Sequence, residues 1–242
     1  MKNITLDFGT PDKYTTREAY NSLRANVQFC DAEIKTIAIT SCDANEGKST
    51  ISINLAKSFA MAGKKVLLVD ADMRNSTMVR KYVRESGIYG LSQFLSGQVE
   101  LDDALFHTQI PNFDIMFAGK YPPNPVELLA NKRFTEFIQT QREIYDYVFI
   151  DTPPLGLVID CAVVSHVCDG AIMVVASGKI KSRQALMVKD QLEKSGTHVI
   201  GAVLNHISAR KNAYMRKYYS KYYYSNSYTS KNPPEEDTTE SK

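Results

Sequence analysis

Six short runs of mostly apolar residues alternate along the chain with segments whose apolar residues are spaced as in helices. Leu55, Phe59 and Ala62 show this helical spacing between two of the runs. Such alternation is typical of parallel strands, which need crossover connections and are buried on both faces. The chain is therefore predicted to be an α/β protein with a mostly parallel sheet and helices on both faces. The predicted strands cover residues 34–40, 65–70, 113–117, 145–150, 171–176 and 199–204.

The two ends of the chain differ in character from this alternating part. Tyr20, Leu23 and Val27 form an apolar stripe, which predicts an amphipathic helix from about residue 16. The C-terminal end is first basic and rich in tyrosine and then polar and acidic, which predicts a disordered tail. We therefore expect an N-terminal segment with a helix at 1–33, a folded domain at 34–208 and a flexible tyrosine-rich tail at 209–242.

The composition argues against several classes of protein. The 242 residues carry 29 Lys and Arg against 27 Asp and Glu, so the net charge of +2 lacks the basic excess of nucleic-acid-binding proteins. No run approaches the roughly 18 apolar residues that span a membrane, and the N-terminus lacks the pattern of a secretory signal. The four cysteines show neither CxxC pairs nor zinc-finger spacing, which indicates reduced thiols. We expect a cytoplasmic protein that does not bind nucleic acid.

The segment after the first predicted strand has the sequence of a phosphate-binding loop. It ends in Gly47-Lys48-Ser49 and leads into a helix, which is the context that such a loop requires. Lys48 would reach the β- and γ-phosphates of ATP, and the Ser49 hydroxyl would ligate Mg²⁺. Cys42 replaces the glycine expected five residues before Gly47, while Asn45 tolerates left-handed backbone angles. The predicted nucleotide-binding residues of the loop are Asp43, Ala44, Asn45, Glu46, Gly47, Lys48, Ser49 and Thr50.

Three aspartates lie at the carboxyl ends of predicted strands. Asp70 and Asp72 follow one buried run, and Asp151 ends another. In an open parallel sheet these strand ends meet at one edge, so the three carboxylates are predicted to converge on the phosphate-binding loop. The alternative is that each aspartate only caps the turn or helix that follows it. Together with Lys48 they form the predicted catalytic set, and Ser49, Asp72 and Asp151 are predicted to hold Mg²⁺.

The loop ending at residue 50, the segment 67–74 and the strand end at 151–153 together resemble the Walker A, A′ and B motifs of bacterial tyrosine kinases. The resemblance extends through Pro122–Leu129 and residues 201–205 to the tyrosine-rich tail. It implies a P-loop NTPase-like fold with deviant Walker motifs. The short chain is similar to the split form of the family, a cytoplasmic kinase activated by the cytoplasmic tail of a separate membrane protein in capsule or exopolysaccharide synthesis.

The resemblance implies an ATP- and Mg²⁺-dependent protein tyrosine kinase that phosphorylates itself in trans and regulates polysaccharide synthesis and export. Lys48 would neutralise the transferring phosphate, Asp70 would orient or deprotonate the phenol, and Asn205 would contact adenine. The expected partners are a membrane adaptor, which recruits the kinase to the inner face of the plasma membrane, a cognate tyrosine phosphatase, other protein substrates and further copies of the chain. Glu18 and Arg24 represent the family's oligomerisation motif, which supports a ring.

Two departures from the family pattern qualify this picture. The loop reads Ala44-Asn45 where the family usually has Pro-Gly, which would reshape the loop or slow nucleotide turnover. Asn21 replaces the first arginine of the oligomerisation motif. Ring assembly is therefore less strongly predicted than nucleotide binding.

A cluster of tyrosines in the tail is the predicted phosphate acceptor. From Ala209 to Tyr218 the extended chain reaches about 30 Å, far enough for the active site of a neighbouring copy. Phosphorylation would reverse the local positive charge and release docked tails. The competing interpretation is an aromatic, basic surface for single-stranded nucleic acid or anionic lipid. The predicted acceptors are Tyr214, Tyr218, Tyr219, Tyr222, Tyr223, Tyr224 and Tyr228.

Two other functions are compatible with the motifs. One is an ATPase switch of the chromosome-partitioning or division-site type, which shares the deviant Walker framework but usually carries a signature lysine at the position of Asp43 and lacks a tyrosine tail. The other is a regulator that binds nucleotide without turnover and scaffolds a polysaccharide machine. Asp43 and the tyrosine cluster favour the kinase over the switch.

Overall fold

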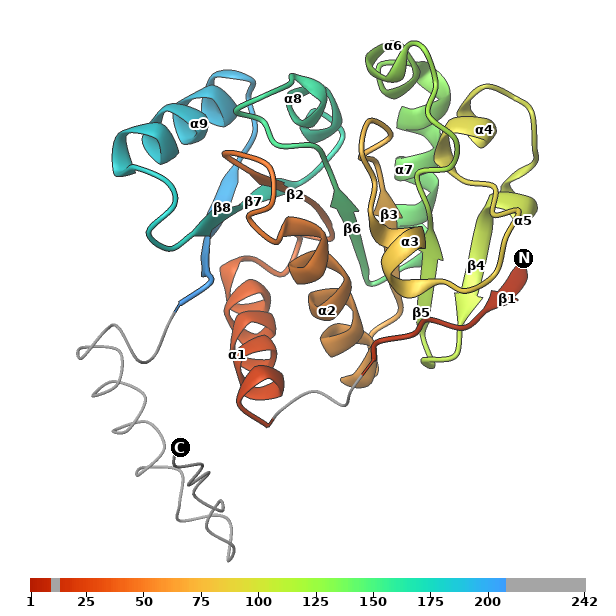
Figure 1. Cartoon of the computed structure of the whole chain (residues 1–242), viewed down its shortest axis with the longest axis horizontal. Coiled ribbons are helices and arrows are strands. Elements are labelled where there is room, and N and C mark those ends of the chain that lie inside the picture. The colour runs from red at the N-terminus through yellow and green to blue at the C-terminus, as the bar shows by residue number, and fades with distance from the viewer. Residues whose placement is uncertain (10–13, 208–242) are drawn as a thin grey trace, which may run out of the picture. The chain divides into compact units, whose positions relative to one another are not determined.

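The computed structural model describes residues 1–9 and 14–207 and builds them around one sheet (Figure 1). Within these residues the sheet has eight strands in the order β1-β4-β5-β3-β6-β2-β7-β8. Neighbouring strands run parallel except β4 and β5, which are antiparallel. The mostly parallel sheet is therefore confirmed. The strands are β1 (Lys2–Ile4), β2 (Thr36–Ser41), β3 (Val66–Asp70), β4 (Leu105–Thr108), β5 (Phe113–Met116), β6 (Tyr147–Asp151), β7 (Gly170–Ala176) and β8 (Val199–Asn205).

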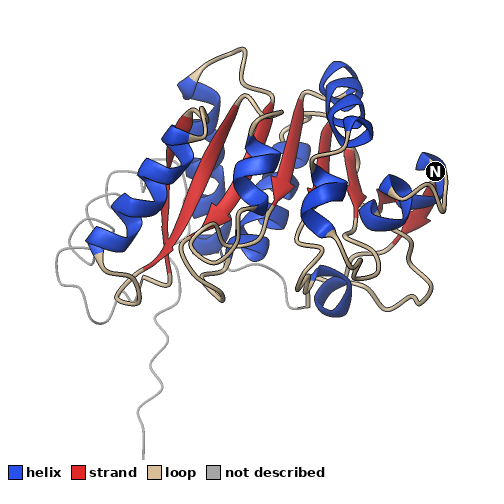
Figure 2. Ribbon diagram, turned by 90° about the horizontal axis from the view of Figure 1, so that it is seen from above, coloured by secondary structure: helices blue, strands red, loops and turns tan. Residues whose placement is uncertain are grey.

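Helices cover both faces of the sheet, as Figure 2 shows from above. One face carries α1 (Tyr14–Cys30), α2 (Lys48–Met61) and α3 (Met78–Tyr82), whose apolar side chains share one hydrophobic layer with the sheet. The helices that contribute to the opposite layer are α4 (Leu91–Leu95), α5 (Leu101–Ala104), α6 (Pro125–Leu129), α7 (Lys132–Ile144), α8 (Asp160–Ser165) and α9 (Ser182–Lys194).

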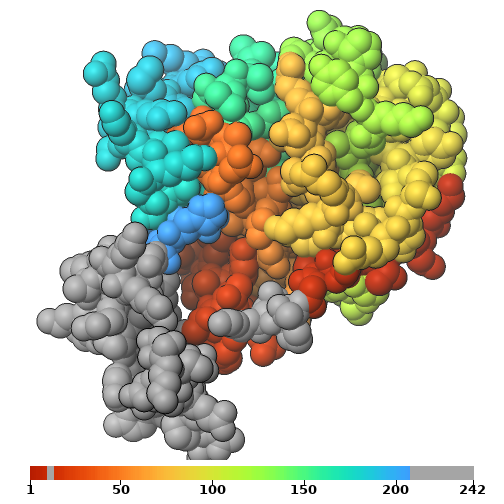
Figure 3. All heavy atoms as spheres, in the orientation of Figure 1, coloured from red at the N-terminus to blue at the C-terminus, as the bar shows by residue number. Residues whose placement is uncertain are grey.

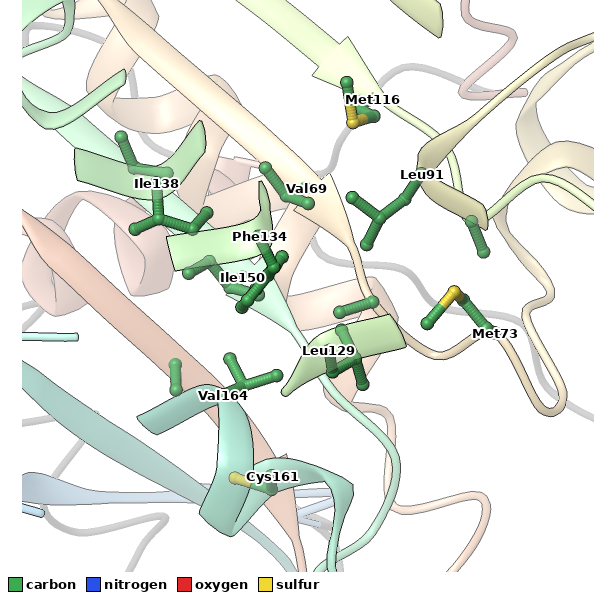
Figure 4. Packing of buried hydrophobic residues seen from close by; sticks show 14 of the residues in the cluster. Val69, Met73, Leu91, Met116, Leu129, Phe134, Ile138, Ile150, Cys161 and Val164 are labelled. Carbon is green, nitrogen blue, oxygen red and sulfur yellow. The ribbon is translucent and has the colours of Figure 1, made fainter. Parts of the chain in front are cut away.

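Alternate residues of the central strands fill the two hydrophobic layers. In β3, Val66 and Leu68 join the layer beneath α1 and α2, whereas Leu67 and Val69 join the opposite layer. This alternation follows from strand geometry, in which successive side chains point to opposite faces. Figure 4 shows part of the second layer, in which Val69 of β3 lies among side chains from neighbouring strands and from helices such as α4 and α7. In the central strands β2, β3 and β6, whose faces are both buried, the polar side chains lie at or next to the strand ends.

All six predicted strands are confirmed, and their bounds differ from the predicted ones by no more than two residues. The predicted N-terminal helix is present as α1 and begins at Tyr14. Sequence reasoning missed β1 and β4, which pair with each other at one edge of the sheet. With only three residues, β1 is too short to show a pattern, and β4 follows α5 without an intervening turn.

Residues Met1–Asn205 form one compact unit. The N-terminal segment belongs to it, because β1 pairs with β4 and α1 packs against α2. In the part of the chain that the structure describes, no helix is long and apolar enough to cross a membrane. The predicted tail at 209–242 lies outside the described residues.

Candidate nucleotide-binding site

The phosphate-binding loop connects the end of β2 to the first residue of α2. Its backbone turns back on itself at Asn45 and Gly47, whose φ angles are 58° and 88°. Both lie in the left-handed region, which glycine and asparagine tolerate best. Asn45 therefore adopts the left-handed conformation that its side chain tolerates. At Cys42 the loop packs closely against the segment that contains Gly156. A Cβ added to Gly156 would lie 2.0 Å from the Cys42 carbonyl oxygen.

A buried carboxylate holds the loop in this shape. The Glu46 side chain is fully buried and accepts hydrogen bonds from the backbone N–H of Asp43 at 2.7 Å and of Ala176 at 2.8 Å. The Glu46 carbonyl oxygen accepts a third bond from Asn205 Nδ2 at 2.9 Å. Ala176 ends β7 and Asn205 ends β8, so one residue ties the loop to two strand ends. Glu46 is thus an internal anchor of the loop.

The Lys48 ammonium lies between two carboxylates at the edge of the sheet where β3 and β6 end. Its Nζ is 2.7 Å from Asp72 Oδ2 and 4.0 Å from Asp151 Oδ2. The register of the sheet places Asp70 directly opposite Asp151. The structure therefore brings the three predicted carboxylates together at the loop. Asp70 and Asp72 also accept backbone N–H bonds from the turn that follows β3, so local capping and convergence occur together.

Burial and mutual repulsion change the charge of this cluster. Burial, followed by the neighbouring Asp151 carboxylate, raises the pKa of Asp70 to about 8. Burial likewise raises the pKa of Asp151, although the Lys48 ammonium and the hydroxyls of Ser49 and Ser52 oppose this change. Burial works against the charged form of Lys48, but the Asp151 and Asp72 carboxylates keep its pKa above the ordinary value. The site is thus a buried place where negative charge exceeds positive charge whenever all three acids ionise.

Two neighbours of the acids were not identified from the sequence. The Ser52 hydroxyl oxygen lies 2.9 Å from Asp151 Oδ1, and the Ser76 hydroxyl donates to Asp70 Oδ2. The one detectable signal was the position of Ser52, which lies one helical turn after Lys48 on the same side of α2.

Arg74 follows the second acidic motif and forms an ion pair. Its Nε donates to both carboxylate oxygens of Asp160, at 3.0 and 2.7 Å. Asp160 is buried at the start of α8. The pair links the segment after β3 to the segment after β6. The Arg74 guanidinium is thus paired with a neighbouring acid.

The residues of the site fit a magnesium–nucleotide complex. Asp151 Oδ2 is buried and has no hydrogen-bond partner, because the Lys48 ammonium lies 4.0 Å away, and a bound metal ion would offset the cost of burying this oxygen. The described residues contain no group of three or more His, Cys, Asp or Glu side chains arranged to hold a metal ion by themselves. Mg²⁺ commonly takes one or two carboxylates and completes its shell with water and phosphate oxygens. Ser49, Asp72 and Asp151 match that incomplete set.

The predicted oligomer-contact residues bind partners within the chain. Glu18 Oε1 accepts from Asn21 Nδ2 at 3.0 Å, and the Arg24 guanidinium donates to the Ser58 carbonyl oxygen at 2.7 Å. Ser58 belongs to α2, so this network fastens α1 to the helix that begins with Lys48. The seven predicted acceptor tyrosines, from Tyr214 to Tyr228, lie outside the described residues.

Comparisons with known proteins agree with this geometry. The family described as AAA domain matches residues 34–200. The tyrosine-protein kinase CpsD of Streptococcus agalactiae serotype Ia is 44% identical over 199 residues, which cover 82% of this chain and 86% of that protein. The crystal structure of the chimerical protein CapA2B2 superposes with a TM-score of 0.77 at 31% identity, covering 86% of this chain and 94% of that chain.

Two further solved structures are similar to the chain, one of a kinase domain and one of a septum site-determining protein. The kinase domain of the Escherichia coli tyrosine kinase ETK has a TM-score of 0.74 at 31% identity, covering 82% of this chain and 79% of that chain. The septum site-determining protein MinD from Pyrococcus horikoshii OT3, complexed with Mg-ADP, has a TM-score of 0.59 at 26% identity and covers 70% of this chain and 69% of that chain.

The fold and the loop define a P-loop nucleotide-binding domain of the AAA-domain class. Within that class, relatives between 35% and 44% identical to the chain are named tyrosine-protein kinases and match along most of their length. The chain belongs to the bacterial tyrosine kinase family. The family resemblance stated from the three motifs is therefore confirmed.

Proposed function

We propose that the chain transfers the γ-phosphoryl group of ATP to tyrosines in the C-terminal cluster of another copy of itself. The observation that carries this proposal is the position of Lys48, a mostly covered ammonium held by Asp72 and close to Asp151 at the start of α2. In a tyrosine kinase of this family, that arrangement is suited to bind Mg²⁺-ATP. The tail supplies the acceptors, from Tyr214 to Tyr228.

Each residue of the site has a distinct role in the proposed reaction. Lys48 leaves Asp72 to neutralise the transferring phosphate, and backbone N–H groups of the loop bind the remaining phosphates. Ser49, Asp72 and Asp151 would hold Mg²⁺ directly or through water, and the bound ion would supply charge neutralisation at the phosphates. Asp70 accepts the proton of the attacking phenol. Its raised pKa, about 8, suits a group that exchanges protons near neutral pH.

The acceptor hydroxyl must displace an existing contact of this base. Asp70 Oδ1 accepts the backbone N–H of Asp72 at 3.1 Å, and Oδ2 accepts the Ser76 hydroxyl. The backbone contact is fixed by the turn, whereas a serine hydroxyl rotates about one bond. The incoming tyrosine therefore takes the place of Ser76 on Oδ2.

The proposal extends to the cellular setting of the kinase. A membrane adaptor with a cytoplasmic tail activates the chain and recruits it to the inner face of the plasma membrane, where it regulates synthesis and export of capsular or extracellular polysaccharide. Further copies of the chain assemble with it through α1, near Glu18 and Arg24, and a cognate phosphatase removes the phosphate. Asn205, whose Nδ2 donates to the Glu46 carbonyl oxygen, contacts adenine in the proposed complex.

The division-site ATPase switch is a weaker alternative. Its supporting observation is the likeness to MinD, but that likeness is lower in identity and covers less of the chain than the match to the named kinases. Asp43 occupies the position of the signature lysine of such switches, which further disfavours this function.

A mixing experiment tests the proposed reaction. One variant keeps the site and lacks every residue after Ala209, and the other keeps the tail and carries Lys48→Met. Transfer in trans predicts that neither variant alone gains phosphotyrosine, whereas the mixture labels the Lys48→Met chain. Label on the truncated chain alone would place the main acceptor outside the tail. Labelling of full-length chain at a rate independent of its concentration, with none in the mixture, would indicate transfer in cis.

A further inference from the structure

A second lysine contacts the phosphate end of α2. Lys81, on α3, donates from Nζ to Thr50 Oγ1 at 2.8 Å. Thr50 is the third residue of α2 and follows Ser49 directly. The two helices are neighbours on the same face of the sheet, and Figure 3 shows their atoms adjacent at the surface. Lys81 is exposed, so its ammonium is accessible to a ligand bound at the loop.

The chemistry of this contact decides which group donates the hydrogen bond and which accepts it. A lysine ammonium has three donors and no acceptor, so Thr50 Oγ1 must accept the bond. The threonine O–H is then left to donate elsewhere. Phosphate oxygens are acceptors, and they bind both a hydroxyl donor and an ammonium. Lys81 and Thr50 together therefore present two donors to an anion at the start of α2.

The ammonium of Lys81 is less neutralised by neighbouring carboxylates than that of Lys48. Lys48 is compensated by the Asp72 carboxylate at 2.7 Å. In the described part of the chain, no carboxylate lies within ion-pair distance of the Lys81 ammonium, which contacts Thr50 and lies over the Tyr82 ring. An uncompensated ammonium beside the amino end of a helix adds to the positive potential that already favours phosphate there.

We propose that Lys81 is a further nucleotide-binding residue, which acts with Thr50 on the phosphates nearest the nucleoside. This rests on the proposed nucleotide site. Backbone N–H groups of such loops bind the α- and β-phosphates, and the loop lysine reaches the β- and γ-phosphates. Thr50 follows Ser49 along α2, so Lys81 reaches the loop at a different residue from Lys48. Lys81 therefore contributes equally to the binding of nucleoside diphosphates and triphosphates.

Nucleotide affinity tests this inference without depending on transfer activity. Dissociation constants for Mg²⁺-ADP and Mg²⁺-ATP are measured by calorimetry for the wild type, Lys81→Met and Lys81→Arg. The matched control is Lys64→Met, which removes the same charge about 20 Å away at the opposite end of α2. Lys81→Met is expected to weaken both nucleotides by about three- to tenfold. Lys81→Arg and Lys64→Met are expected to stay within about twofold.

The outcomes separate this inference from the proposed function. Wild-type affinity for both nucleotides in Lys81→Met, at an unchanged melting temperature, would overturn the role of Lys81 and leave the kinase proposal intact. Loss of affinity for ATP alone would overturn its assignment to the inner phosphates. A wild-type chain that binds neither nucleotide would overturn both proposals. If Lys64→Met weakened nucleotide affinity equally, the effect would come from the net charge of the protein, and the specific contact of Lys81 would be refuted.

Discussion

Substitution of Glu46 by glutamine probes the anchor of the phosphate-binding loop. Glutamine has the same shape, but it replaces one acceptor oxygen by an NH₂ donor. Glu46 uses both oxygens, one toward the Asp43 N–H at 2.7 Å and one toward the Ala176 N–H at 2.8 Å. In Glu46→Gln, one of these N–H groups must face another donor in a fully buried place.

The size of the effect follows from these contacts. A hydrogen bond to a charged group contributes about 1.5–3 kcal/mol, and a buried N–H left without a partner costs about 1–3 kcal/mol. These two figures overlap, because both count the same lost bond. We expect Glu46→Gln to lower the free energy of unfolding by about 3 kcal/mol. Nucleotide affinity is expected to fall too, because the loop backbone no longer has one enforced shape.

Urea unfolding followed by circular dichroism measures the first effect, and calorimetry with Mg²⁺-ADP measures the second. Glu100→Gln is the matched control, because Glu100 is exposed and its side chain makes no capping bond to α5. The control should change stability by less than about 0.5 kcal/mol. A loss below about 1 kcal/mol in Glu46→Gln, with wild-type nucleotide affinity, would refute the role of Glu46 as the anchor.

Two further predictions concern residues outside the catalytic set. Burial opposes ionisation of Asp169, but the N–H groups of Thr36 and Lys35 hold its pKa below the ordinary value. Its ionised form therefore stabilises the fold above the unfolded pKa of about 3.9, and this contribution is lost as the pH falls further. Asp169→Asn should lower the free energy of unfolding by about 2 kcal/mol at pH 7. Urea titrations should show that the difference in this free energy from wild type shrinks below about pH 4. A difference that does not depend on pH would contradict this prediction. Gly156→Ala should lower stability by about 2–3 kcal/mol and weaken Mg²⁺-ADP binding, since its Cβ would clash with the loop backbone; an unchanged melting temperature would count against that packing.

The main features of the fold were predictable because they depend on burial and strand geometry. The central strands carry unbroken apolar runs, and their ends are marked by Asp70 and Asp151. Parallel strands carry their carboxyl ends to one edge, so the meeting of these acids at the loop followed from the order of the elements. The short edge strand β1 gave no such signal, because three residues cannot show a period.

Details of the site were not predictable, because they depend on how elements are rotated against each other. Serines are common in helices and turns, so the position of Ser52 one turn after Lys48 is only a weak signal, and nothing in the sequence marks Ser76 as the partner of Asp70. The inward direction of Glu46 also depends on the closed shape of the loop. Arg24 was predicted as an oligomer contact by resemblance, and only the packing of α1 on α2 reveals its bond to Ser58.

Phosphate mapping tests the central claim most directly. The purified chain is incubated with Mg²⁺-ATP, with and without the cytoplasmic tail of a candidate membrane adaptor, and its peptides are analysed by mass spectrometry beside a Lys48→Met control. We expect phosphotyrosine between Tyr214 and Tyr228, more with the adaptor tail and none in the control. ATP hydrolysis without phosphotyrosine under either condition would contradict the kinase and favour the ATPase switch.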